Sequence, residues 1–180
     1  MPSLLNEEKH QRKSVKILII VLTSVMLVCV SKFSSSLHHT GQTIFATILT
    51  VGVLATYSYD SAILISLIAG GIYSFLSFFG PLILVSWAVR GLTVALLFRL
   101  FSIFKSNPPS AIQVSISMTL SSFATGMTHY LFLIKFLKLV PDPPLYLVMF
   151  TISISVVSTL IASFFATKVI FPRIKSVLHW

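Results

Sequence analysis

One arginine of this sequence lies inside an apolar run, where a charged side chain is costly. Arg90 belongs to the segment "LVSWAVRGLTV" (residues 84–94), and Trp87 precedes it by three residues. In a helix these two side chains share one face. Arg90 comes eight residues after Leu82, so it would lie about 12 Å into a membrane. A guanidinium at that depth costs at least about 2.5 kcal/mol, and it therefore needs a partner or a wet cavity.

The apolar runs contain no carboxylate that could be this partner. The acidic residues fall before the first run or in predicted loops, at Glu7, Glu8, Asp60 and Asp142. Arg90 must therefore use carbonyls, hydroxyls, water, another subunit or a ligand. Three roles stay open: binding an anionic ligand, a structural hydrogen-bonding role, and pairing with a partner subunit. Trp87 would be either an apolar pocket wall stacking on a ligand or a residue of the interfacial aromatic belt.

Histidines are the second kind of candidate. His129 lies late in a hydroxyl-rich apolar run, "QVSISMTLSSFATGMTHY". It would line a polar interior or serve as a hydrogen-bonded packing residue. His38 and His39 lie in "SSSLHHTGQT", which we expect to be a polar loop able to cap a pocket. Adjacent histidines rarely ligate one ion together, and carboxylate co-ligands are missing. We therefore expect no metal site, and haem binding is not favoured either.

The sequence also lacks the residue sets that catalysis requires. It contains no carboxylate pair in an apolar run, no Ser/His/Asp arrangement with an available acid, and no phosphate-binding glycine loop. We therefore do not expect an enzyme, and we expect no cofactor. The absence of a Walker motif means that any ATP-driven function would need a separate ATPase.

Composition places these residues in a membrane protein. Of the 180 residues, 56% are hydrophobic and only 9% are charged, whereas soluble domains carry roughly a quarter charged residues. The net charge is +9, but the basic residues gather at the ends and in the loops. They are not accompanied by the aromatic or polar side chains that recognise nucleic acid, so we do not expect nucleic-acid binding. The single cysteine, Cys29, cannot form an internal disulfide.

Six apolar runs are long enough to be membrane helices. They cover residues 17–36, 42–57, 61–79, 82–104, 111–136 and 145–169, and they are separated by turn signals such as Gly80-Pro81, "SNPPS" and "VPDPP". We therefore predict an all-α, polytopic integral membrane protein with one helical bundle. Its parts are a basic N-terminal segment (residues 1–16), a transmembrane domain (residues 17–170) and a C-terminal tail (residues 171–180).

The basic residues predict the orientation of this bundle. With the N-terminus inside, nine lysines and arginines of the ends and loops fall on the inner side and three, Lys32, Lys135 and Lys138, on the outer side. The positive-inside rule then places both termini in the cytoplasm. We accordingly expect a multi-pass protein of the cell membrane.

Two of the runs carry ladders of small residues, which allow helices to approach closely in lipid. The ladder of the third run is Ala62, Ser66, Gly70 and Ser74, and that of the sixth run is Ser155, Thr159 and Ser163. They would serve either packing within the bundle or docking of a second membrane protein.

The segment "GPLILVSWAVRGLTVALLFRLF" (residues 80–101), together with the chain length and six runs, resembles the S component of energy-coupling factor transporters. The resemblance implies a six-helix bundle that binds a vitamin or metal ion on its outer side under its first loop. It nominates Trp87, Arg90, His129, His38 and His39 for the pocket. It also implies a membrane coupling subunit and two ATPases as partners. Because the first run has no small-residue ladder, docking would use the two ladders above.

Two functions follow as hypotheses. In the first, the chain captures a small anionic or zwitterionic nutrient outside the cell and passes it inward with a separate ATPase module. In the second, it is a non-catalytic accessory subunit of a larger membrane complex such as a respiratory oxidase, and Arg90 meets a neighbour's carboxylate, a lipid or a quinone head group.

Overall fold

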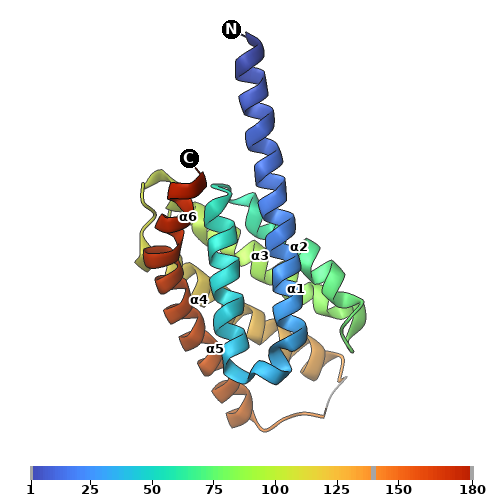
Figure 1. Cartoon of the computed structure of the whole chain (residues 1–180). Coiled ribbons are helices and arrows are strands. Elements are labelled where there is room, and N and C mark those ends of the chain that lie inside the picture. Colours follow the sequence, from blue (N-terminus) through green and yellow to red (C-terminus); the bar gives the residue numbers. More distant parts are fainter. Residues whose placement is uncertain (1, 139–140, 179–180) are drawn as a thin grey trace.

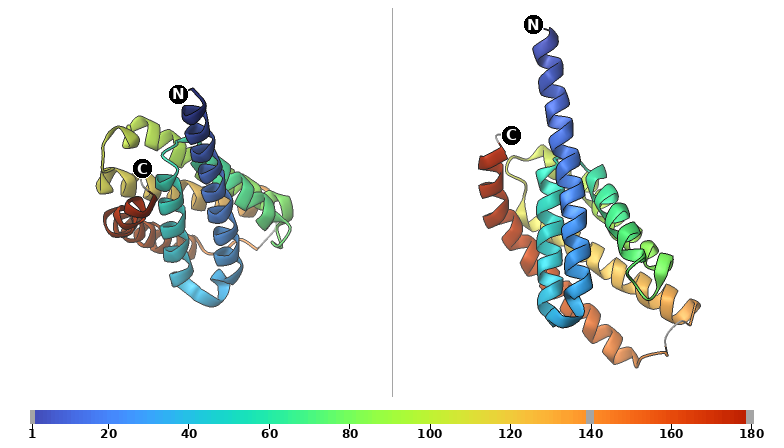
Figure 2. Two further views of the ribbon diagram at one scale, coloured as in Figure 1. Left: turned by 45° about the horizontal axis from the view of Figure 1, so that its top comes forward. Right: turned by 45° about the vertical axis from the view of Figure 1, so that its right-hand side comes forward.

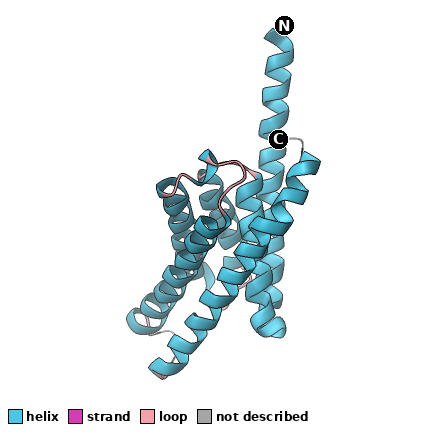
Figure 3. Ribbon diagram, turned by 90° about the vertical axis from the view of Figure 1, so that its left-hand side faces the viewer, coloured by secondary structure: helices cyan, strands magenta, loops and turns pink. Residues whose placement is uncertain are grey.

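The computed structural model describes the backbone of residues 2–138 and 141–178, and their side chains except those of 2–11, 34–40, 133, 177 and 178. All regular structure in these residues is helical (Figures 1 and 3). The helices are α1 (Pro2–Ala55), α2 (Asp60–Ser74), α3 (Ile83–Leu100), α4 (Ala111–Thr128), α5 (Leu145–Phe165) and α6 (Phe171–Leu178). Wider π-helical turns extend α4 over His129–Phe136 and join α5 to α6 over Ala166–Ile170. The predicted all-α fold is confirmed.

Helix α1 folds back on itself near its middle (Figures 1 and 2). Its first arm is Arg12–Phe33 and its second arm is Gly41–Ala55. The arms touch where a glycine permits it, because a Cβ placed on Gly52 would lie only 2.5 Å from Thr23 Oγ1. The chain between the arms is helical, which corrects the expectation of a loop there. His38 and His39 lie in this turn, and their side chains are outside the described residues.

The helices form a closed ring. From α1 to α5 each helix packs on the next in the chain, and α5 closes the ring by packing on α1. The start of α1 and the end of α6 lie at the same end of the bundle, the upper end in Figure 1. The turn of α1, the α2–α3 connection and the end of the α4 extension lie at the opposite end. We call these the terminal end and the turn end.

The bundle has a largely apolar perimeter, and its interior contains both apolar and hydroxyl side chains. Large apolar side chains such as Leu18, Leu96 and Phe165 are more than half exposed. Hydroxyl side chains such as Ser24, Ser121 and Thr159 are buried between helices, and several donate to carbonyls of their own helix. An apolar perimeter and buried hydroxyls that bond to their own helix suit a hydrocarbon surrounding.

Within the described residues, three helical segments are long and apolar enough to cross a membrane. They are Arg12–Phe33, Gly80–Leu100 and Leu145–Ser176, and the apolar helices Gly41–Ala55 and Asp60–Ser74 are shorter. These segments agree with the interpretation as a membrane protein. The number of crossings and the side on which the termini lie stay predictions.

Several predicted helix ends move in the structure. The third run ends at Ser74 instead of residue 79, because Gly80 takes a left-handed φ of 55° next to Pro81 and the preceding residues form tight turns. The fourth ends at Leu100, before the left-handed Ser102. The sixth continues past Pro172, since the wider turn before it accommodates a residue without a backbone N–H donor.

Candidate functional site

A cavity of about 190 Å³ lies toward the turn end of the bundle. Both arms of α1 and helices α2, α3 and α4 contribute to its walls, so segments far apart in the sequence form it. Its lining residues are Val30, Ser31, Gly41, Gln42, Phe45, Tyr73, Ile83, Ser86, Trp87, Arg90, Thr125 and His129. The structure thus brings together three of the five residues predicted for a pocket: Trp87, Arg90 and His129.

Arg90 is the charged residue of this cavity. It is buried, with 6% of its surface exposed. Its Nε and Nη2 atoms have no hydrogen-bond partner among the described residues. The described carboxylates are engaged elsewhere, Asp60 with Arg99 and Asp142 with Lys135. A buried guanidinium with two unpaired nitrogens is costly, so the cavity beside it is where a compensating acceptor would bind.

An aromatic wall flanks the guanidinium. The Phe45 ring lies 4.4 Å from Arg90 Cζ, at cation–π distance. Trp87 meets Phe45 edge-on with ring centroids 5.3 Å apart, and Tyr73 lies 6.0 Å from Trp87. Trp87 is buried, with 8% exposed, so it is a pocket wall in this structure and not a residue of an exposed aromatic belt.

His129 forms another part of the cavity wall. Its Nδ1 lies 3.3 Å from Ser86 Oγ, in a hydrogen bond whose donor depends on the imidazole tautomer. Its ring meets Phe79 edge-on at 5.8 Å. The imidazole therefore contacts both α3 and the connection that precedes it.

The rim is tied together by bonds between helices. The Tyr73 hydroxyl donates to the Ser31 carbonyl at 3.4 Å, which joins α2 to the first arm of α1. Gln42 Nε2 donates to Thr159 Oγ1 at 3.5 Å, which joins the second arm to α5. The sequence interpretation missed Phe45, Tyr73 and Gln42 as site residues. Of these three, only Gln42 could have been recognised from the sequence, because it is a polar amide at the start of an apolar run.

The residues predicted to dock a second protein are mostly covered by the chain itself. Ala62 and Ser66 are buried, and a Cβ on Gly91 of α3 would lie 2.7 Å from Ser66 Cβ. Gly70 packs against Trp87, while Ser74 is half-buried and donates to the carbonyl of Gly71. On α5, Ser155 and Thr159 bond to Ser122 of α4, and Ser163 is buried. Both ladders therefore serve packing within the bundle, the alternative that the sequence left open.

A second hollow, of about 330 Å³, lies between the α4 extension and α5 at the turn end. Its walls are largely apolar, and His129 lines it as well as the first cavity. We call it the α4–α5 groove.

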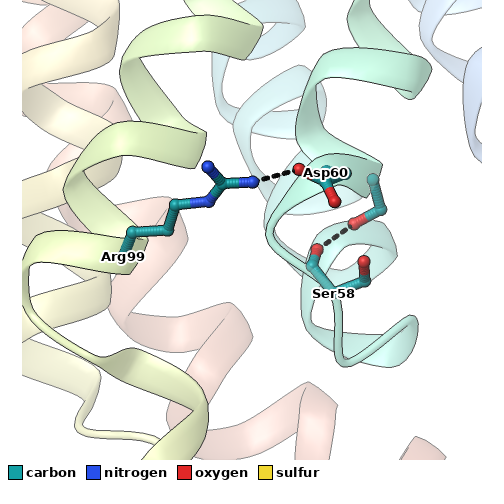
Figure 4. A network of polar contacts seen from close by, with 4 residues as sticks. Ser58, Asp60 and Arg99 are labelled. Atoms are coloured by element: carbon teal, nitrogen blue, oxygen red, sulfur yellow. Dashed lines mark hydrogen bonds and ion pairs between the residues drawn. The ribbon is translucent and has the colours of Figure 1, made fainter.

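The terminal end holds a different kind of arginine. Arg99, in the last turn of α3, forms an ion pair with Asp60 in the first turn of α2 (Figure 4). Both side chains are more than half exposed. Arg99 does not line the cavity. Its pairing with Asp60 was not predicted.

Among the described residues, no group of His, Cys, Asp or Glu side chains is placed to hold a metal ion. Comparisons of the chain with protein-family models, with curated proteins and with solved structures give no match.

Proposed function

We propose that this protein is the substrate-binding membrane subunit of a transporter, and that its cavity captures a small anionic or zwitterionic nutrient from outside the cell. The observation that carries the proposal is Arg90, a buried guanidinium with two unpaired nitrogens beside a cavity. An anionic group there would form charge-assisted hydrogen bonds, which a planar guanidinium can donate in pairs.

The size of the cavity favours a compact ligand. An apolar cavity of about 150 Å³ accommodates benzene. At about 190 Å³, the cavity suits an anionic head group attached to a flat or short apolar body. Trp87, Phe45 and Tyr73 would contact this body, while Gln42 and Thr125 would supply further hydrogen bonds.

The proposed orientation places the cavity on the outer side. The chain would cross the membrane six times, with α1 contributing two crossings, and both termini would lie in the cytoplasm. Support comes from the shared position of the two ends (Figure 1) and from the basic residues Arg99, Lys105, Lys168, Arg173 and Lys175 toward that end. The turn end, with the cavity, would then face outside.

Transport would require partners, and we propose a membrane coupling subunit with ATPases. The two small-residue ladders are used inside the bundle, so they are no longer proposed as the docking surface. The exposed apolar perimeter of α5 and of the first arm of α1 offers lipid-facing surface to such a subunit.

A binding experiment on the full chain in lipid nanodiscs tests this function. The chain contains two tryptophans, Trp87 and Trp180, so a Trp180→Phe background makes Trp87 a reporter of cavity occupancy. Acetate, butyrate, benzoate and inorganic phosphate would be titrated against this protein, with Arg90→Gln as the test variant and Arg99→Gln as the matched control.

Saturable binding that Arg90→Gln removes and Arg99→Gln retains is the expected result. Absence of saturable binding for every probe would contradict a ligand site at Arg90. If Arg90→Gln then also lost a co-purifying membrane protein, the accessory-subunit function would be favoured, with the partner of Arg90 in that subunit.

A further inference from the structure

The α4–α5 groove differs in chemistry from the cavity, although it lies beside it. Its walls are formed largely by Ile134, Pro143, Leu147, Val148 and Ile152. The hydroxyls of Ser122 and Ser155, which also line it, bond to each other at 2.9 Å. The described side chains that line the groove include no lysine, arginine, aspartate or glutamate. Such a surface suits an uncharged apolar group.

One residue borders both spaces. His129 lines both the cavity and the groove. It is held by the 3.3 Å contact with Ser86 and by the edge of Phe79. The imidazole is therefore part of the wall of both spaces.

Adjacent residues of α4 border the two spaces at the same level. Thr125 faces the cavity and its neighbour Gly126 faces the groove. A Cβ on Gly126 would lie 3.1 Å from Ile152 Cγ1. The missing side chain therefore lets α4 approach Ile152 of α5 closely beside the groove.

From this arrangement we propose that the ligand is an amphiphilic anion, whose head group binds Arg90 in the cavity and whose apolar tail passes His129 into the α4–α5 groove. This inference rests on the proposed function and specifies its substrate class. Charge complementarity decides the direction, because the guanidinium lies in the cavity and the groove offers no charged side chain to a head group.

Saturated carboxylates of increasing length test the proposal on the full chain in nanodiscs. Acetate, butyrate, octanoate and decanoate would be titrated against the Trp180→Phe protein, with decanol as the uncharged counterpart of decanoate. The test variant is Val148→Phe, which narrows the groove from α5. The matched control is Val157→Phe, at an exposed position of the same helix that lines neither space.

Affinity, expressed against the aqueous concentration, should rise about fourfold for each methylene that the groove buries. Val148→Phe should leave butyrate binding unchanged but weaken decanoate binding by at least about tenfold, since several methylenes lose their contacts. Val157→Phe should change neither, and Arg90→Gln should weaken every carboxylate.

Three other outcomes are possible, and each leads to a different conclusion. Equal decanoate affinity in Val148→Phe and Val157→Phe would overturn the amphiphile and leave the proposed function with a compact anion. Decanol binding as tightly as decanoate, with loss in Val148→Phe, would make the groove a lipid-chain site unconnected to Arg90. Carboxylate binding that Arg90→Gln does not affect would overturn the proposed function and this inference together.

Discussion

Helix α3 carries two arginines, nine residues apart, whose surroundings are opposite. Arg99 lies at the terminal end, more than half exposed, and pairs with Asp60 (Figure 4). Arg90 lies toward the turn end and is 6% exposed. The Phe45 ring lies 4.4 Å from its Cζ, and two of its nitrogens have no partner among the described residues. The same side-chain chemistry is therefore solvated and neutralised at one end, and buried without a described counter-charge at the other.

The difference shows which arginine needs a functional explanation. An exposed ion pair contributes at most about 1 kcal/mol, and its residues suit a membrane boundary. Arg99 also lies in the last turn of α3 and Asp60 in the first turn of α2, where each charge complements its helix dipole. None of these compensations reaches Arg90, and this is why the proposed function assigns a ligand to it.

The largest expected difference between the two ends is in cysteine labelling from outside the cell. A cysteine at the turn end should be labelled, and one at the terminal end should not. In a Cys29→Ser background, Pro141→Cys near the turn end should react with a membrane-impermeant maleimide on intact cells. Ser106→Cys, in the loop after Arg99, should react only after permeabilisation. Both positions are exposed, so a difference would report sidedness. Labelling of residue 106 from outside, with residue 141 protected, would invert the orientation.

The next contrast concerns the chemistry of Arg90. Arg90→Ala should weaken carboxylate binding roughly 10- to 100-fold, the usual effect of losing hydrogen bonds to a charged group. Arg90→Lys keeps the charge but loses the planar fork, so its loss should be smaller. The same substitutions at Arg99 should leave affinity unchanged. Isothermal titration of nanodisc samples measures all four variants, and equal affinity in all of them would remove Arg90 from the site.

Periodicity and composition were sufficient to predict much of this fold. Long apolar runs indicated the all-helical bundle, and the imbalance between Arg90 and the acidic residues singled out the arginine that lines the cavity. Trp87 followed from its spacing on the same helix. These inferences need only local sequence, since a helix fixes which neighbours share a face.

The remainder depends on contacts between helices that no local pattern encodes. Phe45 meets Arg90 only because α1 folds back through a helical turn, and Gln42 reaches Thr159 only because α5 closes the ring. The small-residue ladders illustrate the same limit. Their spacing indicates close approach, but Gly70 and Ser66 could have faced another protein as readily as α3.

A packing contrast on α2 sharpens the comparison near the cavity. A Cβ on Gly70 would lie 2.6 Å from Trp87 Cβ, whereas a Cβ on the adjacent Gly71 meets nothing within 4 Å. Gly70→Leu should therefore displace α3 and destabilise the protein by about 1–3 kcal/mol. Gly71→Leu should be neutral or slightly stabilising, because glycine is a poor helix former. Thermal unfolding in nanodiscs compares them, and equal midpoints would contradict the packing of Gly70 on Trp87.

The smallest effect is expected for the ion pair at the terminal end. A double-mutant cycle with Asp60→Asn and Arg99→Gln isolates the coupling between the two charges. We expect about 0.2–1 kcal/mol, because both side chains are solvated and ordering them costs entropy. The coupling should fall as salt rises, since exposed charges are screened.

Tyr59, whose ring lies 6.0 Å from Arg99 Cζ, is present in all four proteins, so its contact with Arg99 cancels from the cycle. A coupling above about 2 kcal/mol, insensitive to salt, would mean that this pair is as desolvated as a buried one. Arg99 and Arg90 would then differ only in whether they have a charged partner, and no longer in how far they are buried.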